Sequence, residues 1–150
     1  MKSAKQILDK VRYCTIATVS NDGQPWNTPV FYVYDEDMNI YWWSSQKSVH
    51  SQNIANNSKI FIVVYDSTVR EGEGLGVYIR ATARILEQQD ETDKAIDMYN
   101  QFANVYKIDK KVVSGEAPTR LYTASPENIW MNAESEENGY YIDTRKEISL

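Results

Sequence analysis

The sequence predicts a mainly β protein of the α+β class, built as an antiparallel barrel with a few peripheral helices. Five strand-like runs follow one another in two meanders, and Asn21-Asp22-Gly23 is a strong hairpin signal between the first two. Only one short helical segment separates the third run from the fourth. Strands therefore do not alternate with long helices, which argues against a parallel doubly wound sheet. The length of 150 residues predicts one domain over residues 1–150.

The first third of the chain shows a change from helical to strand periodicity. Apolar residues at helical spacing predict a helix over Ser3–Arg12, with Ser3 as its N-cap. Strands are expected at Tyr13–Ser20 and Trp26–Asp35. Pro29 lies inside the second strand and cannot donate to a ladder, so it predicts a sheet edge, a bulge or a break that faces a ligand.

The middle of the chain alternates between short polar turns and apolar runs. The expected elements are a turn at Glu36–Asn39, a strand at Ile40–Trp43, a short helix at Lys47–Asn57 with Val49 and Ile54 facing inward, and a strand at Ile60–Tyr65 that is buried on both faces. The glycine-rich Gly72–Gly76 segment has no lysine and precedes a strand, so it predicts a turn and not a phosphate loop.

The last part begins with the clearest strand pattern of the chain. Val77–Ile85 alternates between apolar and polar residues and predicts a two-faced strand. The further expectations are a helix at Asp90–Tyr106 capped by Asp90, a polar connector at Lys107–Pro118, and a strand pair at Leu121–Met131 around Pro126. The polar tail Glu134–Leu150 receives no assignment.

Composition and charge exclude several classes of function. The net charge of −5 argues against nucleic-acid or anionic-membrane partners. One cysteine, Cys14, excludes an internal disulfide framework, and one histidine, His50, excludes a multi-histidine metal site, so no metal ligands are expected. No secretory signal and no run of about 20 apolar residues is found, which predicts a cytoplasmic protein. Eleven tyrosines and four tryptophans favour strands and contacts with flat ligands or subunits.

The segment from Trp42 to Asn53 carries the strongest functional signal. An aromatic strand end runs into serines, Lys47 and His50 where a short helix is expected to begin. A helix start has unpaired N–H groups and partial positive charge, and both attract anions. The segment therefore predicts a phosphate site beside an aromatic surface, as a flavin nucleotide requires.

The order of the elements resembles the flavin-binding split β-barrel proteins related to pyridoxamine 5′-phosphate oxidase. The resemblance covers roughly Ile7 to Leu86 and rests on four ordered pieces. These are the leading helix, Ile16–Ser20 followed by Asp22-Gly23-Gln24-Pro25, the strand Thr28-Pro29-Val30, and Ser48–Ile54. The family includes small general-stress members.

The resemblance implies FMN held at the interface of a homodimer. The ring would lie along Thr28, Pro29 and Val30. The other residues implied at the cofactor are Trp43 and Ser44 near the ribityl chain and phosphate, Ser45, Lys47, Ser48 and His50 at the phosphate, and Trp130 over the flavin. No residue of the sequence must act as a general acid or base, so no catalytic residue is assigned.

This chain departs from the family at two places. The family commonly has Ser-Arg-Lys where this chain has Ser48-Val49-His50, so the arginine is lost and a histidine replaces the lysine. Lys47 is close enough to supply a cation, and a phosphate dianion would favour the protonated imidazole, whose ordinary pKa is about 6.5. We therefore expect weaker or more pH-sensitive FMN binding. The C-terminus lacks the family's basic and histidine pattern for pyridoxamine phosphate, so true oxidase activity on that substrate is not expected.

The leading hypothesis is an FMN-dependent oxidoreductase that takes hydride from a reduced nicotinamide or an unknown small-molecule donor. The first alternative is a non-catalytic FMN-binding protein, either a stress-linked carrier or a redox sensor. The second is the same barrel with a deazaflavin or haem in place of FMN. The third is a dimerisation module that has lost its cofactor.

Several residues also have simple structural interpretations. Trp42 and Trp43 must point to opposite faces of their strand, so one is expected in the core. His50 can also be interpreted as a polar helix residue that faces solvent. Cys14 is interpreted as a small core residue, with a Cys14–His50 dyad as the alternative. The carboxylates Asp35-Glu36-Asp37 are interpreted as a solvated hairpin tip.

Overall fold

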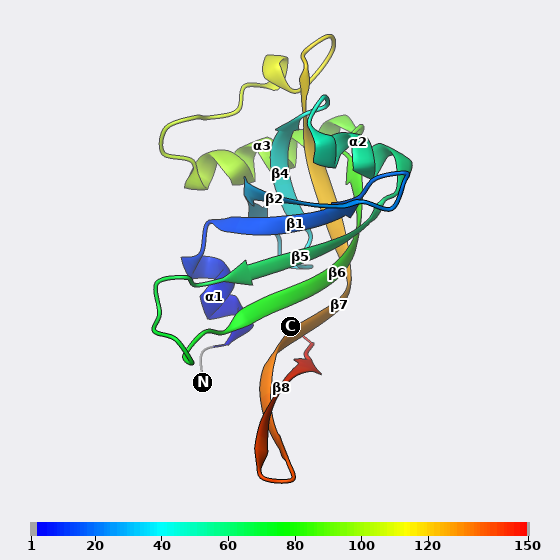
Figure 1. Cartoon of the computed structure of the whole chain (residues 1–150). Coiled ribbons are helices and arrows are strands. Elements are labelled where there is room, and N and C mark those ends of the chain that lie inside the picture. Colours follow the sequence, from blue (N-terminus) through cyan, green and yellow to red (C-terminus); the bar gives the residue numbers. More distant parts are fainter. Residues whose placement is uncertain (1–2, 150) are drawn as a thin grey trace.

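The computed structural model describes residues 3–149 and contains eight strands and three α-helices in that range (Figure 1). In chain order the elements are α1 (Ala4–Lys10), β1 (Tyr13–Val19), β2 (Pro25–Phe31), β3 (Val33–Tyr34), β4 (Ile40–Ser45), α2 (Val49–Asn56), β5 (Lys59–Tyr65), β6 (Gly76–Ile85), α3 (Gln89–Phe102), a 3₁₀ turn at Lys110–Val112, β7 (Thr119–Glu137) and β8 (Tyr140–Glu147).

All strands belong to one antiparallel sheet with the order β2-β1-β5-β6-β7-β4-β3, and β8 pairs with β7 outside this path. The two strands at the ends of the order, β2 and β3, are separated in sequence only by Tyr32. The sheet therefore curls into a barrel whose first and last strands adjoin along the chain. The predicted mainly β antiparallel barrel is confirmed, with α2 and α3 at one end and the β7–β8 hairpin projecting from the other (Figure 1).

Two apolar clusters hold the structure together. The first fills the barrel and includes the fully buried Ile16, Trp42 and Ile79, with Ile7 and Leu8 of α1 packed against it. The second lies between α3 and the sheet and includes Val33, Leu86, Ala95, Tyr99 and Leu121. Burial of these side chains is the main stabilising contribution, at roughly 25 cal/mol per Å² of apolar surface.

The N-terminal helix forms for the reasons that the sequence predicts. The Ser3 hydroxyl accepts from the Gln6 N–H, and the Gln6 side chain accepts from the Ser3 N–H, which completes a capping box. The β1–β2 hairpin also follows its signal, because Gly23 takes a φ of +85° that L side chains rarely adopt. Pro29 lies on β2, an edge strand that pairs only with β1, so the predicted edge position is confirmed.

Four predictions about individual elements are wrong. The strand expected at 26–35 is divided at Tyr32 into β2 and β3. The expected double-sided burial of 60–65 fails because Phe61 is 37% and Tyr65 is 53% exposed. In α2, Ile54 is buried, but Val49 is 41% exposed. Helix α3 is capped by Gln88 and not by Asp90, and Tyr106 lies beyond its end.

The C-terminal third also differs from the expectation. The predicted strand pair at 121–131 is a single 19-residue strand, β7, with a register shift opposite Arg80 and Ala81. Ala81 pairs with Pro126 and Arg80 with Asn128, so the chain bulges beside the proline, which has no N–H for the ladder. The unassigned tail supplies β8, which pairs with β7 from Trp130 to Glu137.

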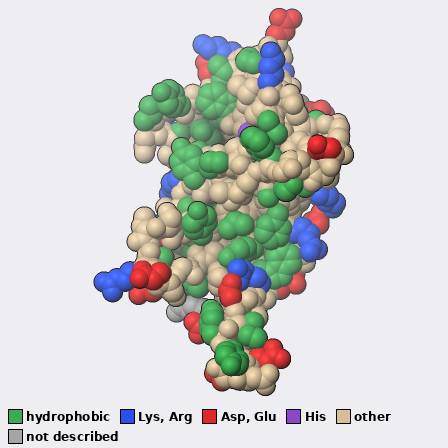
Figure 2. All heavy atoms as spheres, viewed as in Figure 1, with side chains coloured by type: hydrophobic (Ala, Val, Ile, Leu, Met, Phe, Trp, Pro, Cys, Tyr) green, Lys and Arg blue, Asp and Glu red, His purple; other side chains and the backbone are tan. Residues whose placement is uncertain are grey.

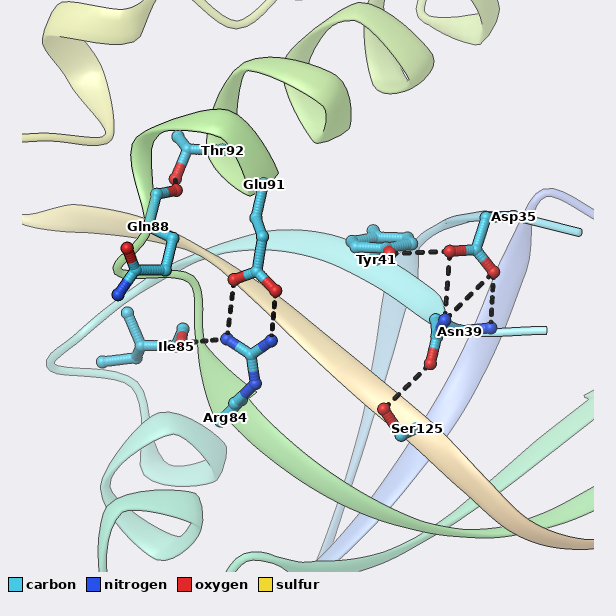
Figure 3. A network of polar contacts seen from close by, with 9 residues as sticks. All are labelled: Asp35, Asn39, Tyr41, Arg84, Ile85, Gln88, Glu91, Thr92 and Ser125. Carbon is cyan, nitrogen blue, oxygen red and sulfur yellow. Dashed lines mark hydrogen bonds and ion pairs between the residues drawn. The ribbon is translucent and has the colours of Figure 1, made fainter. Parts of the chain in front are cut away.

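The hairpin that joins β3 to β4 is held by the Asp35 carboxylate (Figure 3). It accepts from the Asn39 side chain and N–H, from the Asp37 N–H, and from the Tyr41 hydroxyl at 2.8 Å. Burial alone would raise the pKa of Asp35, but these hydrogen bonds outweigh it and the pKa is lowered. A second pair in the same view, Arg84 with Glu91, joins β6 to α3. Asp35 is therefore a structural residue of the predicted hairpin tip.

No helix in the described part of the chain is long and apolar enough to cross a membrane.

Candidate functional site

The start of α2 is open to an anion. Its N-cap residue, Ser48, makes no side-chain hydrogen bond to the helix amides. The first N–H groups of a helix have no partner within the helix, and the macrodipole adds partial positive charge there. A phosphate can accept from these amides, as the sequence predicted for this segment.

The Ser48 hydroxyl does not cap the helix because it takes part in a cluster of hydroxyl groups. It donates to the Ser45 carbonyl at 2.8 Å and lies 2.8 Å from Ser51 Oγ. It is also 3.2 Å from His50 Nε2, and that nitrogen is 2.9 Å from Ser44 Oγ. Ser44, Ser48 and His50 are therefore brought together as predicted. Ser51 was missed, although its position three residues after Ser48 puts it on the same face of the helix.

His50 is a buried member of this cluster. Its side chain is 6% exposed, which excludes the solvent-facing interpretation, and little of it reaches the surface in Figure 2. Burial lowers the pKa of the imidazole below its ordinary value of 6.5. The His50 imidazole is therefore neutral at pH 7 and has one N–H donor and one acceptor nitrogen. The only full positive charge among the predicted phosphate residues is that of Lys47, whose side chain is exposed.

The position of α2 is fixed from the barrel side. Asn53 Nδ2 donates to Thr18 Oγ1 at 3.0 Å, and both side chains are buried. Since Thr18 lies on β1, this bond joins the middle of α2 to the sheet. Helix α2 also contacts β2, and β2 contacts β4. Helix α2 and the edge strand β2 are therefore neighbours, and His50 joins α2 to Ser44 at the end of β4.

The three predicted ring contacts on β2 have different environments. Thr28 and Val30 pair with Ile16 and Cys14 and share their inward face, whereas Pro29 pairs with Thr15 and faces outward. Thr28 Oγ1 accepts from the Trp26 indole at 2.8 Å. The outer edge of β2 has backbone groups without a ladder partner, and these are suited to the polar edge of a flat ring.

Two predicted site residues lie elsewhere in the protomer. Trp43 packs in the cluster under α3, on the opposite face of β4 from Trp42, so its side chain does not line the same space as that of Ser44. Trp130 shares a cross-strand row with Tyr78, Val63, Thr15 and Pro29. Four strand spacings separate it from β2, or about 19 Å along the sheet.

Trp130 instead belongs to an aromatic group on the outer face of the sheet. Its ring stacks with Phe61 at 6.2 Å, and the Arg80 guanidinium lies 5.3 Å from its centroid. Hydrophobic side chains are visible across this face, over β1, β5 and β6 (Figure 2). We call Phe61, Arg80 and Trp130 the outer aromatic group.

Cys14 is a core residue. Its side chain is 1% exposed, and burial raises the pKa of the thiol to about 12. A thiol with this pKa stays protonated, and the imidazole nitrogen of His50 is already paired with serines. The alternative of a Cys14–His50 dyad is therefore rejected. Residues 3–149 also contain no group of three or more acidic, histidine or cysteine side chains that could hold a metal ion.

The fold defines a class, the antiparallel split β-barrel proteins with a few peripheral helices. The family model described as pyridoxamine 5′-phosphate oxidase matches residues 1–133, and the chain belongs to this family. The resemblance noted in the sequence is confirmed. A search of curated protein sequences finds no match.

Solved structures with different properties share the fold. A candidate 5-nitroimidazole antibiotic resistance protein from Bacteroides thetaiotaomicron is 14% identical, with a TM-score of 0.69 over 85% of this chain and 80% of that one. The haem storage protein HutZ from Vibrio cholerae is 17% identical, with a TM-score of 0.68 over 82% and 87%. An FAD-binding protein from Mesorhizobium loti is 16% identical, with a TM-score of 0.63 over 85% and 90%. At these identities the similarity shows the fold alone.

Acidification is expected to destabilise the protein through His50. Its pKa is lowered in the folded state, so the unfolded chain binds more protons between that pKa and about 6.5. The free energy of unfolding should therefore be highest above pH 6.5 and fall as the pH drops below it, by at most about 1.4 kcal/mol per pH unit. Urea unfolding at pH 5 to 7.5 measures this slope. His50→Gln removes the only imidazole of the chain and should flatten it; equal slopes in both proteins would contradict the assignment.

Proposed function

We propose that the protein binds FMN at the start of α2 and acts as a flavin-dependent oxidoreductase. The observation that carries this proposal is the uncapped start of α2 beside the hydroxyls of Ser44 and Ser48 and close to the edge strand β2. FMN supplies hydride and electron transfer when it is bound, and the residues of the chain bind and orient it. A reduced nicotinamide is the proposed donor. The single buried thiol fits a reducing compartment, so we propose a cytoplasmic location.

The residues present fit a phosphorylated ring. The α2 amides, the Ser45 hydroxyl and the Lys47 ammonium supply donors for the phosphate, and Thr28–Val30 offers backbone groups to the ring. Only Lys47 contributes a full charge, because burial favours neutral His50. Bound phosphate would favour the charged imidazole, so the affinity for FMN should rise as the pH falls from 8.5 to 5.5. A flat profile would remove His50 from the phosphate site.

The proposed cofactor site needs a second copy of the chain. Within one protomer four strand spacings, or about 19 Å along the sheet, separate Trp130 from β2, so we propose that Trp130 covers a ring on the β2 of a partner protomer. The exposed aromatic group on the outer face would be buried in such a contact. A two-fold axis would then give two equivalent FMN sites, each bordered by both copies.

Disrupting this face is expected to separate the dimer. Phe61→Lys places an ammonium in the outer aromatic group, directly opposite Arg80 on β6, where Phe61 is 37% exposed in the protomer. Burying an unpaired charge in an interface is costly, so the dimer dissociation constant should rise at least tenfold. Sedimentation of the two proteins measures it. Val105→Lys, at a residue that is 78% exposed in the connector after α3, serves as the matched control. A wild-type monomer that binds FMN would contradict the two-fold site.

The absorption spectrum tests the proposed function directly. The purified protein is expected to be yellow or to quench the fluorescence of added FMN with 1:1 stoichiometry per chain. Anaerobic bleaching by NADH or NADPH would support the enzyme. A colourless protein that ignores FMN would overturn the proposal.

A non-catalytic FMN-binding protein of the general-stress type, a carrier or redox sensor, is the second candidate. This candidate is favoured by the hydroxyl cluster, because its only side chain that titrates near neutral pH, His50, is buried and not exposed to a substrate. Bound FMN that neither nicotinamide reduces would support this reading. Oxidation of pyridoxamine phosphate is not proposed. Of the two basic residues of the tail, Arg145 is held by Asp143 at 2.7 Å and lies over the Tyr78 ring.

The other cofactors considered from the sequence have less support. Haem ligation by Nε2 of His50 would displace its contacts with Ser44 and Ser48. A deazaflavin would use the same phosphate site, and its absorption spectrum would distinguish it from FMN.

A further inference from the structure

A cavity of about 620 Å³ lies between α1, the β3–β4 hairpin and α3. Its size is within the range of small-molecule sites. None of its lining residues belongs to the proposed FMN site. We call it the α1–α3 cavity.

The α1–α3 cavity has charged residues in its lining and one aromatic and apolar part, formed by Tyr32, Tyr34, Met98 and Phe102. The tyrosine hydroxyls already have partners: Tyr32 donates to the Leu8 carbonyl at 3.0 Å, and Tyr34 donates to the Asp9 carboxylate. The rings thus present mainly carbon surface. A planar ring of one or two six-membered cycles would find apolar contacts here, with the flexible Met98 adapting to its outline.

Three cations line the same cavity: Lys5, Arg12 and Lys94. Within residues 3–149 none of them forms an ion pair. Arg12 is the charged group in contact with the aromatic wall, since its guanidinium lies 4.6 Å from the Phe102 centroid. Stacking uses the face of a guanidinium and leaves its N–H edge free for a carboxylate.

The carboxylates of the cavity are less available than these cations. Asp9 accepts from Tyr34, and Asp35 accepts from its own hairpin as Figure 3 shows. Glu36 and Asp37 remain, on the turn between β3 and β4. The positive charge of Arg12 therefore adjoins the Phe102 ring, whereas Glu36 and Asp37 lie on the turn.

We propose that the α1–α3 cavity binds a small planar aromatic carboxylate. The ring packs against Phe102 and Met98, and the carboxylate accepts from the N–H edge of Arg12. This site is independent of FMN, so the protein takes a second class of ligand away from α2.

Three probes with the same ring system test the charge preference: 2-naphthoate, 2-naphthalenemethanol and 2-naphthylmethylamine. Titration of the ¹⁵N-labelled full chain, with amide shifts as the readout, gives both location and affinity. We expect 2-naphthoate to shift the amides of Arg12, Tyr34 and Phe102 saturably, and to bind at least tenfold more tightly than the amine. Binding of the amine as tight as that of the acid, or shifts confined to the start of α2, would overturn the proposal.

Variants then test the role of Arg12. A hydrogen bond to a charged group accounts for about tenfold in affinity, so Arg12→Gln should raise the dissociation constant of 2-naphthoate by about that factor. The side chain is exposed, and an unchanged thermal midpoint verifies that the variant folds. Lys94→Gln gives a second test at the same cavity, and Lys111→Gln, on the 3₁₀ turn, is the matched control. Equal affinities in the Arg12 and Lys111 variants would overturn the proposal. The result does not depend on FMN, because the titration is repeated with and without it.

Discussion

Replacing Trp42 by alanine is expected to lower the free energy of unfolding by about 3–5 kcal/mol. The side chain is 0% exposed inside the barrel, and its ring stacks on Tyr122 with centroids 5.5 Å apart and planes 12° from parallel. Alanine leaves a cavity that the surrounding strands cannot close. Domains are stable by only about 5–15 kcal/mol, so most of the stability should be lost. Urea unfolding followed by far-ultraviolet circular dichroism, at one protein concentration, measures the change.

Two further variants separate the packing of Trp42 from its polar atom. The buried Nε1 of Trp42 has no hydrogen-bond partner among the described residues. Trp42→Phe keeps an aromatic ring and removes this unpaired donor, so its cost should stay below about 2 kcal/mol. Trp26→Ala removes an indole that is 47% exposed and should cost less than about 1 kcal/mol. If Trp42→Ala cost no more than Trp26→Ala, the barrel interior would not be the main source of stability.

The strands that form this core were the most predictable part of the fold. Alternation over 77–85 identified the inward residues of β6 correctly, because a strand with one buried face repeats every second residue. The burial of the apolar run 60–65 was predicted wrongly because this run lacks such an alternation. Its sequence is apolar on both faces, and sequence alone does not say whether the outer face is covered by the same chain or left exposed, as Phe61 is.

The C-terminal hairpin could not be predicted because it has no buried face of its own. Strand β8 is exposed or half-buried along its length, so no apolar period marks it. Its position is fixed by pairing with β7, and Gly139 at the turn takes a φ of +80°. Pairing with a neighbouring strand uses backbone N–H and C=O groups, so it requires no apolar pattern in the sequence.

The candidate site was predicted better in its composition than in its geometry. Serines, a lysine and a histidine at a helix start indicated the hydroxyl cluster, and Ser44, Ser48 and His50 do meet. The alternation that separates Trp42 from Trp43 was not applied to Trp43 and Ser44, which also point to opposite faces of β4. The remoteness of Trp130 depends on strand order, which no local pattern encodes.

The largest effect on ligand binding is expected from Ser48→Asp. Aspartate is a preferred N-cap residue, and its carboxylate can accept from the α2 amides that the serine leaves uncapped. The helix should keep its stability, because a negative charge at its start interacts favourably with the macrodipole and offsets the lost hydroxyl contacts. The same carboxylate occupies the position proposed for the FMN phosphate. Affinity for FMN should therefore fall at least a hundredfold, which fluorescence titration at pH 7.5 measures.

Gln88→Asp is the matched control for this variant. Gln88 is the N-cap of α3 and, like Ser48, makes no side-chain hydrogen bond to the helix amides. Aspartate there adds the same capping group and the same charge, so the two variants have the same net charge. We expect Gln88→Asp to leave FMN affinity within about twofold of wild type, since local occupation of the amides, and not net charge, causes the loss. Similar affinities in both variants, with α2 intact by amide shifts, would mean that the phosphate does not bind at the start of α2.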